Sequence, residues 1–476
     1  MIKLRRFLKP FLPGLLIAII LLFIQAICEL NLPNYMSNIV NVGIQQGGVE
    51  DSTPKALSQD GYSFITTFMD DDERAVMEQS YTLASGADKD AKGKPVSDTY
   101  PKAADEQIYV LRSDLPTDQR EKLDAVFGNA TWTMVNVLKT VQVAQNDGTL
   151  AAQLGLGDVG LGDIDTNELS AATGGDPNSA DLQSLDFSKI YQFQPLLELL
   201  PQQWFDDARN QALNMDESLR QQSGTMLVSG FYRELGCDMA SIEVGYILRI
   251  GLIMLLITAL SGVATVLVGY ISSRIGAGVA RDLRKSVFEK VEGFSHAEFD
   301  RFSTASLITR STNDVAVIQM MLTMGIRMIC YAPIMGIGGT FMALQKSVSM
   351  SWIIGVAVIV VAGIMLVLVA VVMPKFKIMQ TLIDRLNLVA REALNGLMVV
   401  RAFSRADFEK KRFDVANRDL TSVNLFVNRA MTFLMPVMMV FMNGVTLLII
   451  WVGAQHVADS QMQVGDMMAY MQYVMQ

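Results

Sequence analysis

Five runs of apolar residues, each about as long as a bilayer is thick, limit what this chain can fold into more than any other feature. A helix needs roughly 20 such residues to cross the ~30 Å hydrocarbon core. Runs of this kind occupy Phe11–Leu32, Ile242–Ile271, Met320–Leu344, Trp352–Met373 and Phe433–Val452. Because lipid offers no partners to backbone polar groups, each run is expected to be a helix. The sequence therefore predicts an all-α polytopic membrane protein.

The first apolar run has an alternative explanation, a cleaved signal peptide. No A-x-A-like cleavage site follows it, and its apolar part is long, which favours a retained span. The basic residues of Met1–Lys9 place the N-terminus in the cytoplasm by the positive-inside rule.

Charge is divided unevenly along the chain. Residues 34–240 carry 32 acidic and 14 basic side chains, a net charge of −18. The rest of the chain carries 16 acidic and 25 basic side chains, a net charge of +9. Because the N-terminus is expected in the cytoplasm, the acidic segment that follows the first span is expected outside the cell. Residues 43–240 are therefore interpreted as an extracellular insert, and it is mainly helical because helical periodicity recurs in Asp71–Leu83, Arg120–Val143 and Leu182–Glu217.

The remaining loops fit one topology. The stretches between spans two and three and between spans four and five are rich in Lys and Arg, so both are expected in the cytoplasm. Residues 1–42 then form the N-terminus and first span of a multi-pass plasma-membrane protein, and residues 241–476 form the rest. Met467–Met475 is too short to cross, so we expect the chain to stop inside a sixth span.

The two cytoplasmic stretches share a design. Phe294–Asp314 reads FSHAEFDRFSTASLITRSTND, a polar turn with aromatic residues between two helical patterns. Arg391–Phe413 reads REALNGLMVVRAFSRADFEKKRF and has the same layout. Each aromatic piece is too short to bury its own rings, which predicts two docking tips at the ends of helical hairpins. Packing within each hairpin is the alternative.

These stretches resemble the intracellular loops of the transmembrane half of ABC exporters of the multidrug and lipid type. Glu298–Asp314 is similar to the first coupling loop of that family. Glu392–Phe403, which reads E-x-L-x-G-x-x-V-V-R-A-F, is similar to the second. The resemblance covers the chain up to Val42 and again from Ile242 to the end, and it leaves the insert unidentified.

The resemblance implies a six-helix transmembrane domain with an incomplete sixth helix. It also implies that two sets of residues dock on ATPase domains. The first set is Glu298, Phe299, Asp300, Arg301 and Phe302, and the second is Gly396, Val400, Arg401, Ala402 and Phe403.

Cofactors and partners follow from the same resemblance. No G-x-x-x-x-G-K-[ST] phosphate loop occurs in these 476 residues, so ATP and Mg²⁺ are implied for a nucleotide-binding domain, fused beyond the sixth span or separate. The other expected partners are a second half-transporter, identical or different, a small amphipathic substrate and the bilayer. The large insert is similar to one carried by one subunit of some bacterial heterodimeric multidrug exporters. We expect no catalytic residue, metal site or nucleic-acid partner in this chain.

Polar residues inside spans are costly and are candidates for the transport path. These are Gln25, Glu29, Arg327 and Asn443, and Glu29 would suit a cationic substrate. Structural pairing is the alternative for each. Methionines cluster near Met320–Met328 and Met431–Met442, where adaptable side chains suit varied ligands or simple packing.

The sequence thus predicts the permease half of an ATP-driven exporter of small amphipathic molecules working by alternating access. A membrane receptor with a ligand-binding ectodomain and a dedicated lipid or peptide exporter are the alternatives. An ion-coupled carrier is less well supported, because neither inverted repeats nor broken helices are evident.

Overall fold

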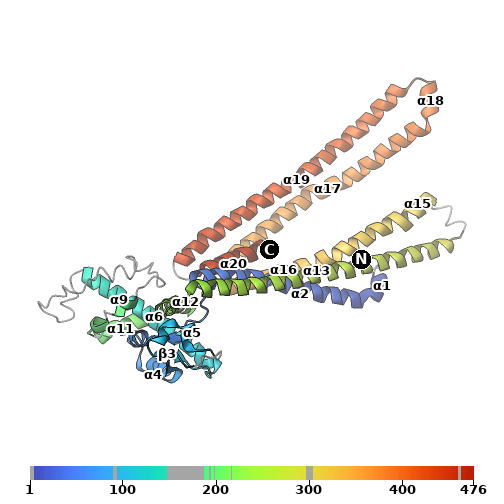
Figure 1. The fold of residues 1–476 in the computed structure, drawn as a ribbon. Coiled ribbons are helices and arrows are strands. Elements are labelled where there is room, and N and C mark those ends of the chain that lie inside the picture. Colours follow the sequence, from blue (N-terminus) through green and yellow to red (C-terminus); the bar gives the residue numbers. More distant parts are fainter. Residues whose placement is uncertain are drawn as a thin grey trace. The chain divides into compact units, whose positions relative to one another are not determined.

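The computed structural model describes residues 5–88, 94–146, 187–191, 194–197, 199–215, 217–295, 304–458 and 462–476. Contacts divide the chain into two compact units. The first holds Met1–Gly338 and His456–Ala469, and the second holds Gly339–Gln455 and Tyr470–Gln476. Helices dominate both units (Figure 1).

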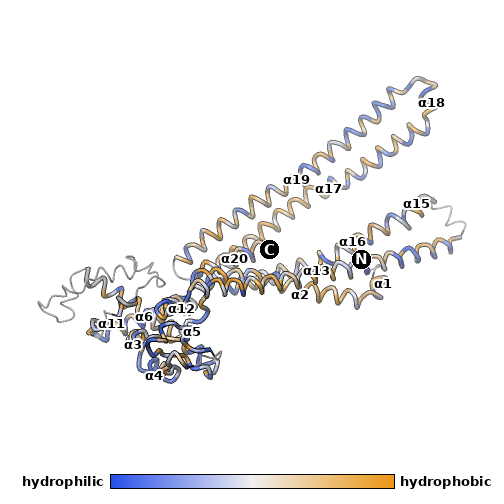
Figure 2. The backbone as a smooth tube through the Cα atoms, viewed as in Figure 1, coloured by the Kyte–Doolittle hydropathy of each residue, from blue (hydrophilic) through white to orange (hydrophobic). Residues whose placement is uncertain are grey.

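Within the described residues, five helical segments are long and apolar enough to cross a membrane, as the apolar runs predict. They are Arg6–Gln45, which contains α2 (Leu12–Asn38); α13 (Met239–Glu292); Ser306–Lys346, which contains α16 (Val315–Lys346); α17 (Ser351–Asn395); and α19 (Ala406–Ala458). Figure 2 shows long apolar stretches along α2 and α13. At about 1.5 Å per residue, helices of 54 and 53 residues, α13 and α19, extend well beyond a bilayer core.

The first segment is assembled from short pieces. α1 (Arg5–Leu8) and η2 (Lys9–Phe11) precede α2, and the π-helical turn η3 (Ile39–Gln45) follows it. α20 (Val464–Met475) has 12 residues, fewer than a spanning helix needs. Helical structure of the first segment continues to Gln45, and the next spanning helix, α13, begins at Met239.

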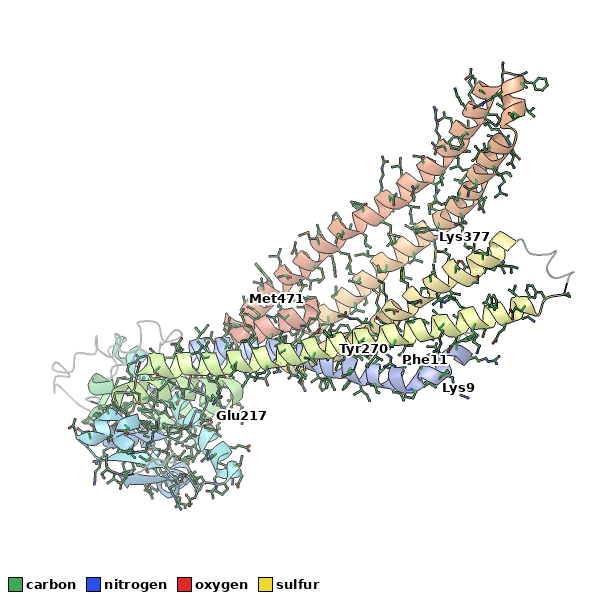
Figure 3. The ribbon with its side chains drawn as sticks, turned by 45° about the vertical axis from the view of Figure 1, so that its right-hand side comes forward. Lys9, Phe11, Glu217, Tyr270, Lys377 and Met471 are labelled. Carbon is green, nitrogen blue, oxygen red and sulfur yellow. The ribbon has the colours of Figure 1, made fainter. Side chains whose placement is uncertain are left out.

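α2 packs along α13 through small residues. A Cβ at Gly278 would lie 2.4 Å from the Phe11 ring, and one at Gly14 would contact Ile275 at 3.6 Å. Figure 3 shows Lys9 and Phe11 near the N-terminal end of α2, and Gly278 lies in the C-terminal half of α13. Larger side chains at Gly278 would force the helices apart, so close approach of the backbones depends on this residue.

The insert contains a small antiparallel sheet that the helical interpretation missed. Its strands are β1 (Ala56–Leu57), β2 (Tyr81–Ala84) and β3 (Ile108–Leu111), in the order β1-β3-β2. Ala56 pairs with Val110, and Leu83 pairs with Tyr109. The helix expected over Asp71–Leu83 therefore ends at Ser80, because Tyr81–Ala84 pairs with β3.

The other elements of the described insert are helices. They are α3 (Gln59–Thr66), α4 (Asp71–Ser80), α5 (Val96–Thr99), η4 (Pro101–Ala104), α6 (Thr117–Asn146), α9 (Phe187–Ile190), α10 (Gln194–Leu197), α11 (Gln202–Leu213) and α12 (Glu217–Glu234). The periodic stretch Arg120–Val143 falls inside α6. The stretch Leu182–Glu217 is not one helix where it is described: Pro201 precedes α11 as its N-cap, so α10 and α11 are separate helices.

The insert has its own hydrophobic core. Phe64, Phe68, Phe127 and Phe231 are each no more than 1 % exposed, and they pack with aliphatic residues from α6, α11 and α12. Burying each such ring contributes about 2 kcal/mol. A core of this size is typical of a domain that folds as a unit.

In the second unit, α17 and α19 form a long helical hairpin closed by α18 (Leu397–Ala402) (Figure 1). Tyr470 belongs to the C-terminal half of α20 and is fully buried. Its hydroxyl donates a hydrogen bond of 2.7 Å to the carbonyl of Met350, in the turn that precedes α17. This bond ties α20 to one end of the hairpin.

Candidate functional site

The tip of the α17–α19 hairpin is formed by a short helix between two turns. Gly396 ends α17, where its N–H donates to the Glu392 carbonyl at 2.9 Å, and α18 begins at the next residue. Ser404 closes the tip with a φ of 55°, a left-handed conformation that is rare outside glycine. The N–H of Arg405 then bonds back to the Val400 carbonyl at 2.9 Å. Both turns are therefore fixed by backbone hydrogen bonds.

The tip presents apolar side chains to its surroundings. Met398, Val399 and Phe403 are 81 %, 61 % and 75 % exposed, and Leu397 is exposed beside them. Arg401 and Ala402 are exposed as well, whereas Val400 is half-buried. These large apolar side chains lie on or beside a helix of six residues and are not covered by the described part of the hairpin.

Ion pairs brace the hairpin behind the tip. Arg412 on α19 lies 2.6 Å from Glu392 on α17, and Arg385 lies 3.2 Å from Asp419. Each pair is exposed, so its contribution to stability is small. Each pair nevertheless joins α17 to α19, which favours motion of α17, α18 and α19 as one rigid body.

The residues of the first predicted tip, Glu298, Phe299, Asp300, Arg301 and Phe302, lie outside the described part of the chain. The flanking structure is described. α13 ends at Glu292, and the chain resumes in α15 (Thr304–Thr309) and the π-helical turn η6 (Arg310–Asp314) before α16. A mostly apolar cavity of about 370 Å³ lies beside these ends, lined by residues that include Phe7, Leu283, Phe294 and Leu307.

A polar cluster joins α2, α13 and α16 within the spanning segments. Glu29 Oε1 accepts hydrogen bonds from Gln25 Nε2 at 2.9 Å and from Ser261 Oγ at 3.0 Å. Glu29 Oε2 accepts one from the Tyr331 hydroxyl. Gln25 itself is only 2 % exposed. Both carboxylate oxygens are thus occupied by side chains of the protein, which favours structural pairing for Gln25 and Glu29.

The structure brings together some of the predicted path residues but not all. The side chains of Gln25 and Glu29 are hydrogen-bonded to each other. Arg327 lies one helical turn before Tyr331 and is near enough for its charge to act on Glu29. Asn443 lies on α19 in the second unit, where it is exposed. Sequence reasoning missed Ser261, which counted only as a small packing residue, and Tyr331, whose polar hydroxyl inside an apolar run was the available signal.

The insert carries a cavity of about 400 Å³ where it meets the start of α13. Its lining includes Glu50, Lys55, Tyr232 and Cys237. The acids there have partners, because Arg249 lies 2.5 Å from Glu50 and Lys55 lies 3.2 Å from Asp51. Burial raises the pKa of the Cys237 thiol to about 11, so the thiol is a poor metal ligand near neutral pH. Among the described residues, no group of three or more His, Cys, Asp or Glu side chains is placed to hold a metal ion.

Comparisons with known proteins agree with the resemblance read from the two tips. The family model of the ABC transporter transmembrane region matches residues 221–476, more than half of the chain. An uncharacterized ABC transporter ATP-binding protein of Mycobacterium bovis is 36% identical over 230 residues, which cover 48% of this chain and 40% of that protein.

Two further relatives are similar over comparable lengths. An uncharacterized ABC transporter ATP-binding protein of Bacillus subtilis is 32% identical over 223 residues, covering 47% of this chain and 39% of its own. The ATP-dependent lipid A-core flippase of Pseudomonas fluorescens is 25% identical over 224 residues, covering 46% and 36%. The chain thus spans about two fifths of the length of these relatives. With five candidate spanning helices and a family match over residues 221–476, the chain belongs to the ABC transporter transmembrane region family.

Proposed function

We propose that the chain is the transmembrane part of an ATP-driven exporter, which moves small amphipathic molecules out of the cell by alternating access. The observation that carries the proposal is the braced hairpin with its exposed apolar tip, Leu397, Met398, Val399 and Phe403. An exporter needs such a surface to receive mechanical work from an ATPase domain.

The ATPase would be a nucleotide-binding domain, fused to this chain or separate. The G-x-x-x-x-G-K-[ST] loop that cradles phosphates does not occur in these 476 residues, so ATP and Mg²⁺ would bind to that domain. The relatives from Mycobacterium bovis and Bacillus subtilis carry ATP-binding in their names, which supports such a partner. A second half-transporter, identical or different, would complete the path.

The proposed mechanism is mechanical. ATP-driven closure of the nucleotide-binding domains would pull on α18, and the Glu392–Arg412 and Arg385–Asp419 pairs would transmit the pull to both long helices. Only contacts that differ between the two conformations drive such a change. The nucleotide-binding domain must therefore bind the tip more tightly in one conformation than in the other. The first tip, with Phe299 and Phe302, would act in the same way.

The proposed topology follows from the charge distribution. The basic N-terminus and both tips would face the cytoplasm, and the acidic insert of residues 43–240 would face the outside of the plasma membrane. An insert between the first two spans with its own core, including Phe64 and Phe231, suits a role at the exit of the path.

The experiment uses the full-length protein with its partner in proteoliposomes, and measures ATP hydrolysis and transport together. We expect a double variant, Met398→Ala with Phe403→Ala, to keep its affinity for ATP and to lose most of its transport per ATP hydrolysed. Phe413→Ala, which removes a ring exposed on α19 away from the tip, is the matched control and should transport normally. Undiminished transport in the double variant would remove the docking tip from the mechanism.

A further inference from the structure

We propose that Arg327 and the methionines Met320, Met324 and Met328 form a binding face for amphipathic anions, which makes Arg327 a specificity-determining residue of the transport path. The inference rests on the proposed function and deepens it by naming the substrate class. The anionic group is a carboxylate or a phosphate, and the apolar body lies along the methionines.

Arg327 lies inside the spanning segment rather than at its cytoplasmic end. Gly276 on α13 approaches Thr323, and its neighbour Ile275 approaches Gly14, which is the third residue of α2. Further along, Tyr331 on α16 bonds to Glu29, near the other end of the apolar part of α2. Arg327 is one turn beyond Thr323 and one turn before Tyr331. Its depth is therefore bracketed by Gly14 and Glu29.

The guanidinium of Arg327 is exposed and donates no hydrogen bond to a described residue, although its charge lies near enough to act on Glu29 and on the Tyr331 hydroxyl. An arginine inside a span is costly, and such residues ordinarily pair or line a polar path. Its planar fork of five donors fits carboxylate and phosphate groups in two-point hydrogen bonds. The unmet donors point to an anionic ligand.

The helix face around Arg327 is made of long, adaptable side chains. Met320, Met324 and Met328 follow one another at four-residue steps and are 61 %, 69 % and 76 % exposed. Residues at this spacing share one face of a helix, and Arg327 is three residues after Met324 on the same side. Unbranched thioether side chains adapt to apolar bodies of different shapes. A charged head beside such a face matches an amphipathic molecule.

The cluster at Glu29 argues against a cationic ligand at the same place. Gln25, Ser261 and Tyr331 already donate to both of its carboxylate oxygens. A cation would have to displace these donors, whereas an anion at Arg327 displaces none of them. The polar group with open hydrogen-bonding capacity is therefore the positive one.

The test compares three probes with one tail and different heads, namely dodecyl phosphate, dodecanol and dodecyltrimethylammonium. Binding to the chain in nanodiscs of zwitterionic lipid is measured by displacement of a fluorescent fatty acid. We expect dodecyl phosphate to bind about tenfold more tightly than dodecanol, as hydrogen bonds to charged groups allow. Arg327→Gln should abolish this preference, and Arg327→Lys should keep most of it.

Two controls accompany the test. Arg274→Gln removes another exposed arginine, on α13, and should leave the preference unchanged, which separates Arg327 from general attraction of anions to basic surfaces. Met324→Gln should weaken all three probes alike, and Met324→Leu should not.

Two outcomes overturn the inference, namely an anion preference that survives Arg327→Gln and a wild-type preference for the cation. If Arg327→Gln also alters dimerisation while the preference survives, this face of α16 is assigned to contact with a second subunit instead. In each case ATP-driven transport of another cargo by the full-length protein would leave the proposed function standing, and the absence of any ATP-driven transport would refute that function instead.

Discussion

The hydroxyl of Tyr331 on α16 donates a hydrogen bond to Glu29 on α2, although 302 residues separate the two in the chain. Ser261 on α13 donates to the same carboxylate at 3.0 Å. One half-buried acid thus links three spanning helices through hydrogen bonds. In lipid, water does not compete for these bonds, so each contributes to the packing of the helices.

We expect Tyr331→Phe to lower the free energy of unfolding by about 1 kcal/mol, because Glu29 Oε2 loses its donor while the packing of the ring is kept. Denaturation of the chain in mild detergent measures the change. Tyr270→Phe removes a hydroxyl from a tyrosine that is 59 % exposed on α13 and should change stability little. Equal effects of the two substitutions would mean that the bond to Glu29 contributes nothing.

The ion pair between Arg412 and Glu392 should affect coupling more than stability. Both residues are exposed, so Arg412→Gln should leave the melting temperature nearly unchanged and lower transport per ATP roughly twofold. Exchange of the two charges, Glu392→Arg with Arg412→Glu, should restore coupling. Arg418→Gln is the control, because Arg418 pairs with Asp414 on its own helix at 2.8 Å. No loss of coupling in Arg412→Gln would show that the pair does not transmit force.

The start of α20 is fixed against the end of the first helical segment. Gly465 N–H donates to Asn41 Oδ1 at 2.8 Å, and Ser37 Oγ donates to Asp466 Oδ1 at 2.9 Å. A Cβ at Gly465 would lie 2.5 Å from Asn41 Oδ1 and 2.6 Å from the Ser37 carbonyl. We therefore expect Gly465→Ala to destabilise the protein by about 1–3 kcal/mol.

Gly444→Ala is the matched control for this substitution. A Cβ at Gly444 would meet nothing within 4 Å, so alanine there should be neutral or slightly stabilising in the middle of α19. Detergent denaturation compares the two variants. Equal stability of Gly465→Ala and Gly444→Ala would refute the close contact between α20 and the first segment.

The thiol of Cys237 should react slowly and with a steep dependence on pH. Burial raises its pKa from an ordinary value of 9.0 to about 11. Because the thiolate is the nucleophile, alkylation at pH 8 should be about a hundredfold slower than that of an ordinary thiol. The rate should rise about tenfold per pH unit and level off only near pH 11. Unfolding should restore the ordinary rate, and fast alkylation of the folded protein would contradict the burial.

The spanning helices were predictable because an apolar run of about 20 residues has few alternatives in water or lipid. The short turn between α17 and α19 was also predictable, because Gly396 and Phe403 belong to a local sequence motif. The sheet of the insert was not predictable from the sequence. Its strands have two to four residues, and β1 and β3 pair across some 50 positions, so the pairing of Ala56 with Val110 leaves no local periodicity.

The polar cluster was predictable in part. Glu29 and Gln25 were evident as polar residues in an apolar run, but their partners depend on how α2, α13 and α16 are rotated about their axes. No spacing along the chain records that rotation, so Ser261 and Tyr331 emerged only from the structure. The exposure of Arg327 beside three methionines has the same origin.

The central claim is that the tip of the α17–α19 hairpin faces the cytoplasm while the insert faces outward. The most direct test labels single cysteines with a membrane-impermeant maleimide, in a background without native cysteines. Asp72→Cys, at an exposed position of α4 in the insert, should be labelled in intact cells, and Arg405→Cys, beside the tip, only after permeabilisation. Labelling of Arg405→Cys in intact cells would contradict the account.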